Sequence, residues 1–200
     1  MNKTFKEALQ HRRSCYAISN CSPVSDNQIE EIIRFAVLNT PSAFNSQSTR
    51  LVLLLGENHA GLWNIVKNEL KKIVPESNFP ATENKIDKSF ASGYGTVLFF
   101  EDQSVVKELQ DAFPLYADQF PVWSQHTSAM HQLVVWTMLD DAGFGASLQH
   151  YNPLIDDAVH KTWNLDKNWT LTAQMPFGVK VQEPGKKEFK PLSERIKIFK

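Results

Sequence analysis

Three short clusters of polar residues carry the side chains best suited to binding chemistry. The first is Arg12-Arg13-Ser14, which follows a short amphipathic segment. Two guanidinium groups and a hydroxyl suit a phosphate, or a planar heterocycle that bears carbonyl groups. A pair of arginines at a helix end can also simply complement the helix dipole. From these residues alone, both interpretations stay open.

The second and third clusters combine amide side chains with turn residues. In the polar turn Pro41–Gln47, Asn45 and Gln47 place two carboxamides at alternate positions. A carboxamide both donates and accepts, so the pair suits a ring edge with N–H and C=O groups, although an Asn45 that caps the backbone is the alternative. The third cluster, which contains Gln149 and His150, follows an expected strand. Polar groups beyond strand ends are common ligand positions, and a simple turn before a proline is the alternative.

Other catalytic signatures are absent from the sequence. It contains no G-x-x-x-x-G-K-[ST], H-E-x-x-H, G-x-S-x-G or G-x-G-x-x-G pattern. Cys15 and Cys21 are too far apart for a C-x-x-C motif, and the spacing of His126 and His131 does not place them on one helix face. We therefore expect neither a metal site nor a catalytic thiol.

Composition and charge exclude several classes of protein. The 200 residues are 42% hydrophobic and 22% charged, which is typical of a globular chain. The net charge of -1 gives no overall basic field, so we expect no nucleic-acid partner. Apolar runs such as Leu51–Leu55 are too short to span a membrane, and the first residues lack an apolar leader. We therefore expect a cytoplasmic protein without a membrane partner.

The basic residues are concentrated at the two ends of the sequence. Residues 1–16 carry four basic side chains against one acidic side chain, and residues 186–200 carry six against two. Two basic termini could converge on one anion, whereas the alternative is that both ends are solvated. The five apolar side chains within the second segment argue against a free, solvated end.

Hydrophobic periodicity predicts a layered α/β or α+β fold in a single domain over residues 1–200. The expected helices are 4–11, a helix capped at Ser25 that ends before Pro41, one around 62–73, a short one within 75–88, pieces at 104–109 and 113–120, a long helix 122–141, and 156–163. The expected strands are 49–55, 96–100, 143–148 and 171–177. On the long helix the pattern predicts an inward stripe of Met130, Leu133, Val134, Thr137 and Met138, with Val135 and Trp136 outside it.

In their order along the chain, the three clusters resemble motifs of the nitroreductase family. The resemblance rests on Arg12-Arg13-Ser14, on the P-S-x-x-N-x-Q turn at 41–47 and on the G-x-G-x-x-L-Q-H-Y-N-P segment at 143–153. The segments FNSQSTRLVLLLG, GTVLFFED, FPLYADQFPVWS and GASLQHYNPLID are similar to its short branch of fatty-acid-repression-mutant-like and copper-stress-like nitroreductases. The resemblance covers essentially the whole chain.

This resemblance implies a central, mainly antiparallel sheet flanked by helices in an intertwined homodimer. It implies noncovalent FMN at the subunit interface, with NADH or NADPH as cosubstrate and small-molecule acceptors in a ping-pong cycle. No catalytic side chain is expected, because the chemistry takes place at the flavin N5 atom. The residues that it assigns to FMN binding are Arg12, Arg13, Ser14, Asn45, Gln47, Gln149, His150, Lys187 and Arg195. Lys186 and Lys190 are alternatives for the phosphate contact.

The acceptor side of the expected site departs from the larger members of the family. Ser48-Thr49 stand where those members have Pro-Trp, and residues 148–151 replace their Pro-x-Glu-Gly motif. Their acceptors therefore do not transfer to this chain. The candidates for the wall of an acceptor pocket are Phe44, Tyr116, Phe120 and Trp123, with ordinary core packing as the alternative for each.

Two functions follow from the resemblance. The first is an FMN-dependent NAD(P)H oxidoreductase that reduces nitroaromatic or quinone-type acceptors, with a stress response suggested by the branch. The alternative is a flavin-binding regulatory or ligand-sensing dimer with little turnover.

Overall fold

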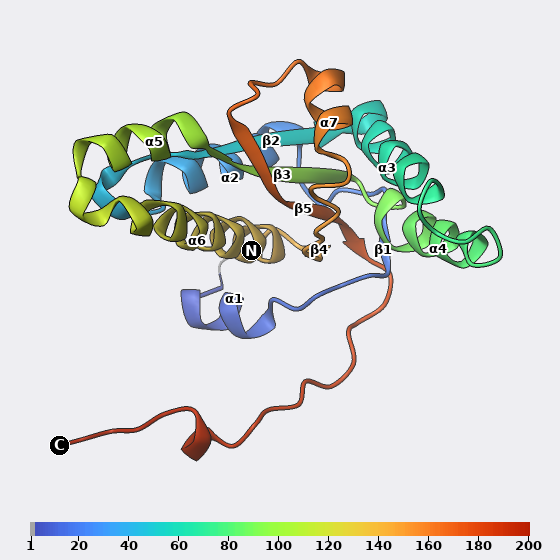
Figure 1. Cartoon of the computed structure of the whole chain (residues 1–200). Helices are drawn as coiled ribbons and strands as arrows, with labels where there is room; N and C mark the ends of the chain where they lie inside the picture. Colours follow the sequence, from blue (N-terminus) through green and yellow to red (C-terminus); the bar gives the residue numbers. More distant parts are fainter. Residues whose placement is uncertain (1–2) are drawn as a thin grey trace.

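An antiparallel sheet forms the centre of the molecule, which a computed structural model describes over residues 3–200 (Figure 1). Its strands are β1 (Ile18–Ser19), β2 (Thr49–Leu55), β3 (Gly95–Asp102), β4 (Phe144–Ala146) and β5 (Trp169–Lys180). The strand order is β1-β5-β3-β2, and β4 also pairs with β5. All four pairings between these strands are antiparallel, as expected.

The helices agree with most of the expected ranges. They are α1 (Phe5–His11), α2 (Asp26–Asn39), α3 (Gly56–Lys71), α4 (Phe79–Ile86), α5 (Gln103–Ala112), α6 (Phe120–Asp141) and α7 (Asp156–Trp163). Short 3₁₀ or π turns lie at η1 (Ala43–Asn45), η2 (Asp87–Ala91), η3 (Pro114–Gln119) and η4 (Leu192–Glu194). The predicted cap of α2 is confirmed, because Ser25 Oγ accepts from the Gln28 amide and the Gln28 side chain accepts in return. No helix within residues 3–200 is long and apolar enough to cross a membrane.

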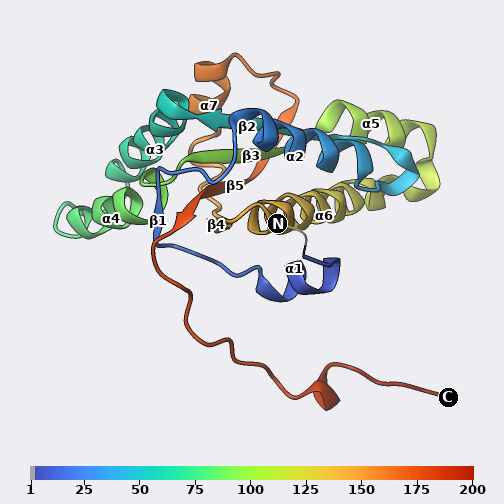
Figure 2. The same ribbon diagram turned by 180° about the vertical axis from the view of Figure 1, so that it is seen from behind.

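Strand β3 is buried on both faces and separates two layers of helices. Val97 and Phe99 pack into a core formed with α2 and α6, whereas Leu98 and Phe100 pack into a second core formed with α3 and α7. This alternation follows from the two-residue period of a strand. Figure 2 shows the same layers from behind, and in both ribbon views the chain leaves them after β5 and runs past α1.

Some of the expected boundaries are wrong. The strand expected to run through residue 148 ends at Ala146, after which Gln149 makes an isolated bridge to Gln174. Strand β1 was not expected, because two residues carry no periodic pattern. Strands β3 and β5 are longer than expected, since polar residues or glycines interrupt the apolar runs at their ends, among them Glu101 and Asp102 in β3 and Thr170 and Gly178 in β5.

The predicted inward stripe of α6 is also wrong in part. Val135, expected outside the stripe, is fully buried, whereas Met130 and Leu133, expected inside it, are 38% and 43% exposed. Because α6 is apolar on nearly every side, the spacing of its apolar residues cannot identify the side that faces the sheet. Apolar side chains of α6, including Met130 and Leu133, therefore lie on the outer surface of the single chain.

His59 ties α3 to the sheet through a neutral imidazole. The Trp63 indole donates to Thr96 Oγ1 (3.1 Å), which leaves the Thr96 hydroxyl to donate to His59 Nδ1 at 2.8 Å. His59 Nε2–H then donates to the carbonyl oxygen of Ala91 at 3.2 Å. Burial lowers the pKa of His59 below its ordinary value of 6.5.

We expect this buried imidazole to make the fold less stable in mild acid. Below the unfolded pKa of 6.5, the unfolded chain binds a proton at His59 that the native protein does not bind. The free energy of unfolding should therefore fall as pH falls from 6.5 towards the lower native pKa, by at most about 1.4 kcal/mol per pH unit from this group. Urea unfolding at several pH values should show a shallower decline in His59→Gln than in the wild type. Equal slopes would contradict the neutral, buried imidazole.

Candidate functional site

The Arg12-Arg13-Ser14 motif is joined to β4 by backbone pairing. Ser14 bridges Ala146, and the Cys15 amide donates to the Ala146 carbonyl oxygen at 2.9 Å. A Cβ at Gly145 would lie 2.8 Å from the Cβ of Cys15, so only glycine permits this close approach. Gly145, the second glycine of the Gly-x-Gly pattern, therefore serves strand packing, whereas Gly143 adopts a left-handed φ of 97° in the turn before β4.

Arg12 and Arg13 have different environments. The guanidinium of Arg12 lies over the Trp136 ring of α6, 4.3 Å from its centroid. Arg12 Nε and Trp136 Nε1 are both buried, and neither has a hydrogen-bond partner among the described residues. Arg13 Nη2 donates to the Gly185 carbonyl oxygen at 2.9 Å, and Arg13, Ser14 and Lys186 line a groove of about 490 Å³. The two basic ends of the sequence therefore meet at this groove.

The turn that carries Asn45 and Gln47 is strained. Phe44, Asn45 and Gln47 have φ angles of 56°, 52° and 50°, in the left-handed region that non-glycine residues seldom adopt. Ser42 holds the turn from inside: its carbonyl oxygen accepts from the Asn45 amide and its Oγ from the Gln47 amide, both at 3.0 Å. Within residues 3–200, neither side-chain carboxamide forms a hydrogen bond, which leaves both available to a ligand. We call residues 41–47 the amide turn.

The four aromatic residues expected at an acceptor pocket form one cluster. Phe44 stacks on Trp123, with centroids 5.9 Å apart and planes 16° apart, and also contacts Tyr116 and Phe120. An apolar pocket of about 400 Å³ is lined by Ala43, Phe44, Trp123, His126, Thr127 and Met130. Phe120 is buried behind Phe44, and Tyr116 packs at the edge of the cluster.

Gln149 and His150 lie on a segment held by a buried glutamine. Gln149 and Gln174 exchange backbone hydrogen bonds of 2.7 and 2.9 Å. The Gln174 side chain accepts from the Tyr151 amide at 2.7 Å and donates to Asn152 Oδ1 at 3.2 Å. His150 is exposed, so its ring is accessible to a ligand.

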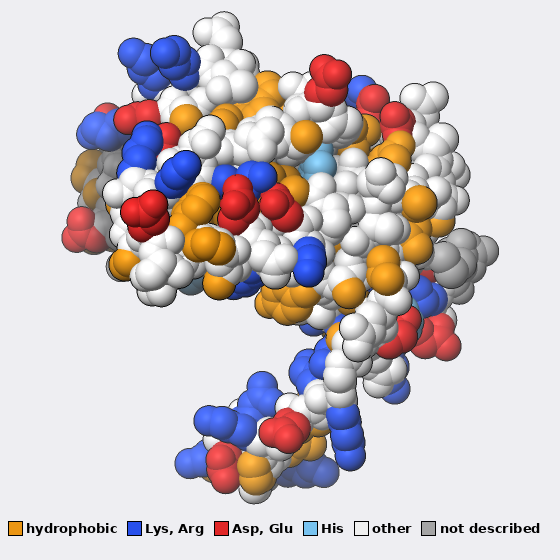
Figure 3. All heavy atoms as spheres, turned by 90° about the vertical axis from the view of Figure 1, so that its right-hand side faces the viewer, with side chains coloured by type: hydrophobic (Ala, Val, Ile, Leu, Met, Phe, Trp, Pro, Cys, Tyr) orange, Lys and Arg blue, Asp and Glu red, His pale blue; other side chains and the backbone are white. Residues whose placement is uncertain are grey.

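The C-terminal tail, residues 183–200, extends away from the layers in the single chain. Lys187 lies over the ring of Phe189, 5.1 Å from its centroid, and Arg195 is exposed. The exposed apolar side chains of the tail are Phe189, Leu192, Ile196, Ile198 and Phe199. Figure 3 shows the tail below the body of the molecule, with basic side chains and apolar ones on the same segment.

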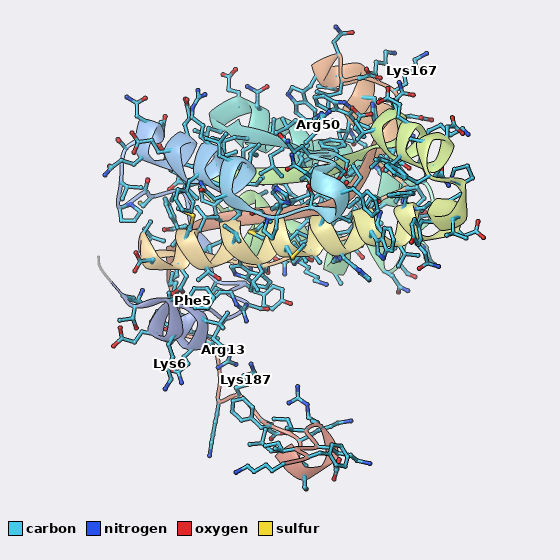
Figure 4. All side chains as sticks on the ribbon, turned by 90° about the vertical axis from the view of Figure 1, so that its left-hand side faces the viewer. Phe5, Lys6, Arg13, Arg50, Lys167 and Lys187 are labelled. Carbon is cyan, nitrogen blue, oxygen red and sulfur yellow. The ribbon has the colours of Figure 1, made fainter. Side chains whose placement is uncertain are left out.

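Two of the predicted groups of FMN ligands lie on opposite sides of α6. Arg13 lies on the same side as α1 and Lys187, whereas Arg50 lies on the other side of α6 (Figure 4). Arg50 marks the amide turn, because its Nη1 donates to the Gln47 carbonyl oxygen at 2.7 Å. We call Arg12, Arg13 and Ser14 the cationic group. One chain does not bring this group and the amide turn together.

Three side chains beside these groups were missed in the sequence. Trp136 packs against Arg12, Arg50 binds the end of the amide turn, and the fully buried Glu101 binds the two residues that follow it. Burial raises the pKa of Glu101, and the hydrogen bonds from Ser48 and Thr49 partly oppose this shift. The signal for Glu101 in the sequence was an acidic residue directly after the apolar run of β3. Over residues 3–200 no three His, Cys, Asp or Glu side chains gather as metal ligands.

Comparison with known proteins gives consistent matches. The model of the Nitroreductase family matches residues 9–179. The nitroreductase FRM2 of Saccharomyces cerevisiae is 32% identical over 189 residues, which cover 92% of each protein. The solved nitroreductase CinD of Lactococcus lactis is 44% identical with a TM-score of 0.91, over 98% of this chain and 100% of CinD, in a complex with nicotinic acid. CinD was also solved with chloramphenicol and with 4-nitrophenol.

A protein of Exiguobacterium sibiricum, solved in complex with FMN, has a TM-score of 0.70 at 13% identity, over 100% of this chain and 99% of its own. At that identity the likeness shows a shared fold alone. The structural matches confirm the expected nitroreductase-like fold, and the family match supports an oxidoreductase activity. Because the family model matches most of this chain, residues 9–179, the chain belongs to the nitroreductase family.

Proposed function

We propose that the protein is an FMN-dependent oxidoreductase that takes electrons from NADH or NADPH and reduces nitroaromatic or quinone-type acceptors in a ping-pong cycle. The observation that carries the proposal is the Arg12 side chain, stacked on Trp136 with a buried Nε that has no partner within residues 3–200. A buried donor without an acceptor is costly, so this side chain suits a ligand that brings an acceptor atom.

The residues present fit FMN, whose ring carries carbonyl and N–H groups and whose phosphate is an anion. Arg12 and Arg13 would bind the ring edge and stabilise negative charge there. The carboxamides of Asn45 and Gln47 would bind donors and acceptors of the ring. When bound, FMN would supply the atom that accepts and returns the hydride, so the chain needs no nucleophile. One FMN-binding domain over residues 1–200 would account for all the motifs.

Other residues would complete the binding of FMN. Gln149 and His150 lie on the segment that follows β4, the strand to which the cationic group is joined. Ser14 lies at the groove beside Arg13 and Lys186, which suits a phosphate. Lys187 and Arg195 stay candidates for the phosphate contact from the tail.

The apolar pocket beside the amide turn suits a flat, aromatic acceptor. Phe44 and Trp123 offer ring surfaces on its wall, against which a planar ring would pack. His126 is the polar side chain of the lining that would donate to a nitro or carbonyl oxygen, because the Thr127 hydroxyl already donates to the Trp123 carbonyl oxygen at 3.0 Å. The complex of CinD with 4-nitrophenol is consistent with this class of acceptor.

A homodimer would solve the separation of the two groups. A second copy could present its amide turn to the cationic group of the first chain, so that each site is shared. The single chain also exposes apolar side chains that an interface would cover, including Phe5, Phe35 and Leu133. Phe5 and Phe35 line a groove of about 520 Å³ between α1, α2 and α6. We expect an interface of about 2,000 Å² or more in total.

A spectroscopic experiment tests the proposed activity. The purified protein, loaded with FMN, is titrated anaerobically with NADH or NADPH and then with a nitroaromatic or a quinone. We expect the flavin absorbance to bleach with a nicotinamide and to return with the acceptor. An oxidised spectrum that persists with both nucleotides would contradict the oxidoreductase and favour the regulatory flavin-binding dimer.

Removal of the tail after Gly185 should weaken FMN binding and dimerisation together. This truncation keeps the Arg13 contact to Gly185 but removes the exposed apolar and basic side chains beyond it. The full-length variant Lys187→Ala/Arg195→Ala is the matched control, because it keeps the apolar residues and should weaken FMN binding while the dimer mass is retained. Flavin titration and light scattering measure the two effects. A truncated chain with wild-type FMN affinity and dimer mass would show that the tail is neither ligand nor clasp.

A further inference from the structure

We propose that Glu101, which forms the end pair of the β2–β3 ladder with Thr49, is a positioning residue that holds the amide turn in its binding conformation. The proposal rests on the proposed FMN site in so far as the turn presents Asn45 and Gln47 to the flavin. The Glu101 carboxylate binds Ser48 and Thr49, which follow the turn, rather than Asn45 or Gln47, so it acts through other residues.

Glu101 binds the two residues that directly follow the amide turn. Ser48 Oγ donates to Glu101 Oε2 at 2.5 Å, and Thr49 Oγ1 donates to Glu101 Oε1 at 2.6 Å. Glu101 and Ser48 are both 0% exposed, and Thr49 lies opposite Glu101 in the β2–β3 register. Each carboxylate oxygen therefore receives one hydroxyl, and the charge-assisted hydrogen bonds fix where the turn ends.

Arg50 supplies a second contact to the same place. Its Nη1 donates to the Gln47 carbonyl oxygen at 2.7 Å, and its Nη2 pairs with Asp102 Oδ2 at 2.9 Å. The Asp102 amide in turn donates to the Ser48 carbonyl oxygen at 2.9 Å. Glu101 and Asp102, at the end of β3, thus hold three consecutive residues at the start of β2: Ser48, Thr49 and Arg50.

These contacts explain how a strained turn can persist. Three residues of the amide turn have left-handed φ angles although none is glycine, so the relaxed chain would prefer another conformation. Such conformations persist only where the surroundings over-determine them. A buried carboxylate is itself expensive, and a β-branched pair would fill a strand end at lower cost. The free-energy cost of burying Glu101 is explained if the carboxylate is needed to hold Asn45 and Gln47 in the geometry that binds the ligand.

The test compares buried hydroxyls at the two ends of β3. Ser48→Ala removes one donor to Glu101 beside the amide turn. Thr96→Val is the control, because the equally buried Thr96 lies at the other end of β3 from Glu101, where its hydroxyl contacts His59 and Trp63. Each variant is measured for FMN affinity by flavin fluorescence, for thermal stability, and for hydrogen exchange of residues 42–48 without FMN.

We expect Ser48→Ala to lower FMN affinity by about tenfold and to speed amide exchange in residues 42–48. Ser48→Thr, which keeps the hydroxyl, should restore both. Thr96→Val should lose stability and leave both readouts near the wild type. The proposal is overturned if Ser48→Ala changes neither readout, or if Thr96→Val changes both to the same extent. A wild-type chain that binds no FMN would contradict the proposed function, and the exchange measurement would still decide whether Glu101 holds the turn.

Discussion

The packing of α6 against the sheet is the constraint on which the arrangement of the candidate site depends. Val135 and Leu139 of α6 share one core with Val97 and Phe99 of β3, so the helix cannot move without opening that core. With α6 fixed there, Arg12 packs on Trp136 of this helix. Arg13 lies on one side of α6, and Arg50, which binds the end of the amide turn, lies on the other (Figure 4). A shared site between two copies of the chain is the arrangement that this packing favours.

Three features that cost folding free energy at the candidate site also favour a site completed by a ligand or a second subunit. The structure keeps left-handed backbone at Phe44, a buried carboxylate at Glu101 and, on Arg12, a buried donor that has no partner within residues 3–200. Each lowers stability, and none improves the packing of the two cores. Sequence rules are commonly broken at functional sites, where a ligand or a second subunit supplies the missing contacts. The three costs lie within or beside the motifs that the sequence singled out.

Much of the fold was predictable from the sequence, because strong local signals mark its elements. The capping box at Ser25 and the apolar run of β2 gave correct predictions for this reason. The inward side of α6 was not predictable, since Val135 and Leu133 are equally apolar and only tertiary packing separates them. The motifs identified the candidate ligands, but Glu101 and Arg50 act through contacts between strands that are about fifty residues apart in sequence. Such contacts leave no periodic signal.

Complementation between two inactive variants tests the shared site most directly. One chain carries Arg12→Ala and Arg13→Ala, the other carries Asn45→Ala and Gln47→Ala, and the two are mixed under conditions that exchange subunits. A site built from both chains predicts that about a quarter of the FMN-binding sites return, because about half of the dimers are mixed and each has one intact site. A mixture that binds no more FMN than either variant alone would contradict the shared site.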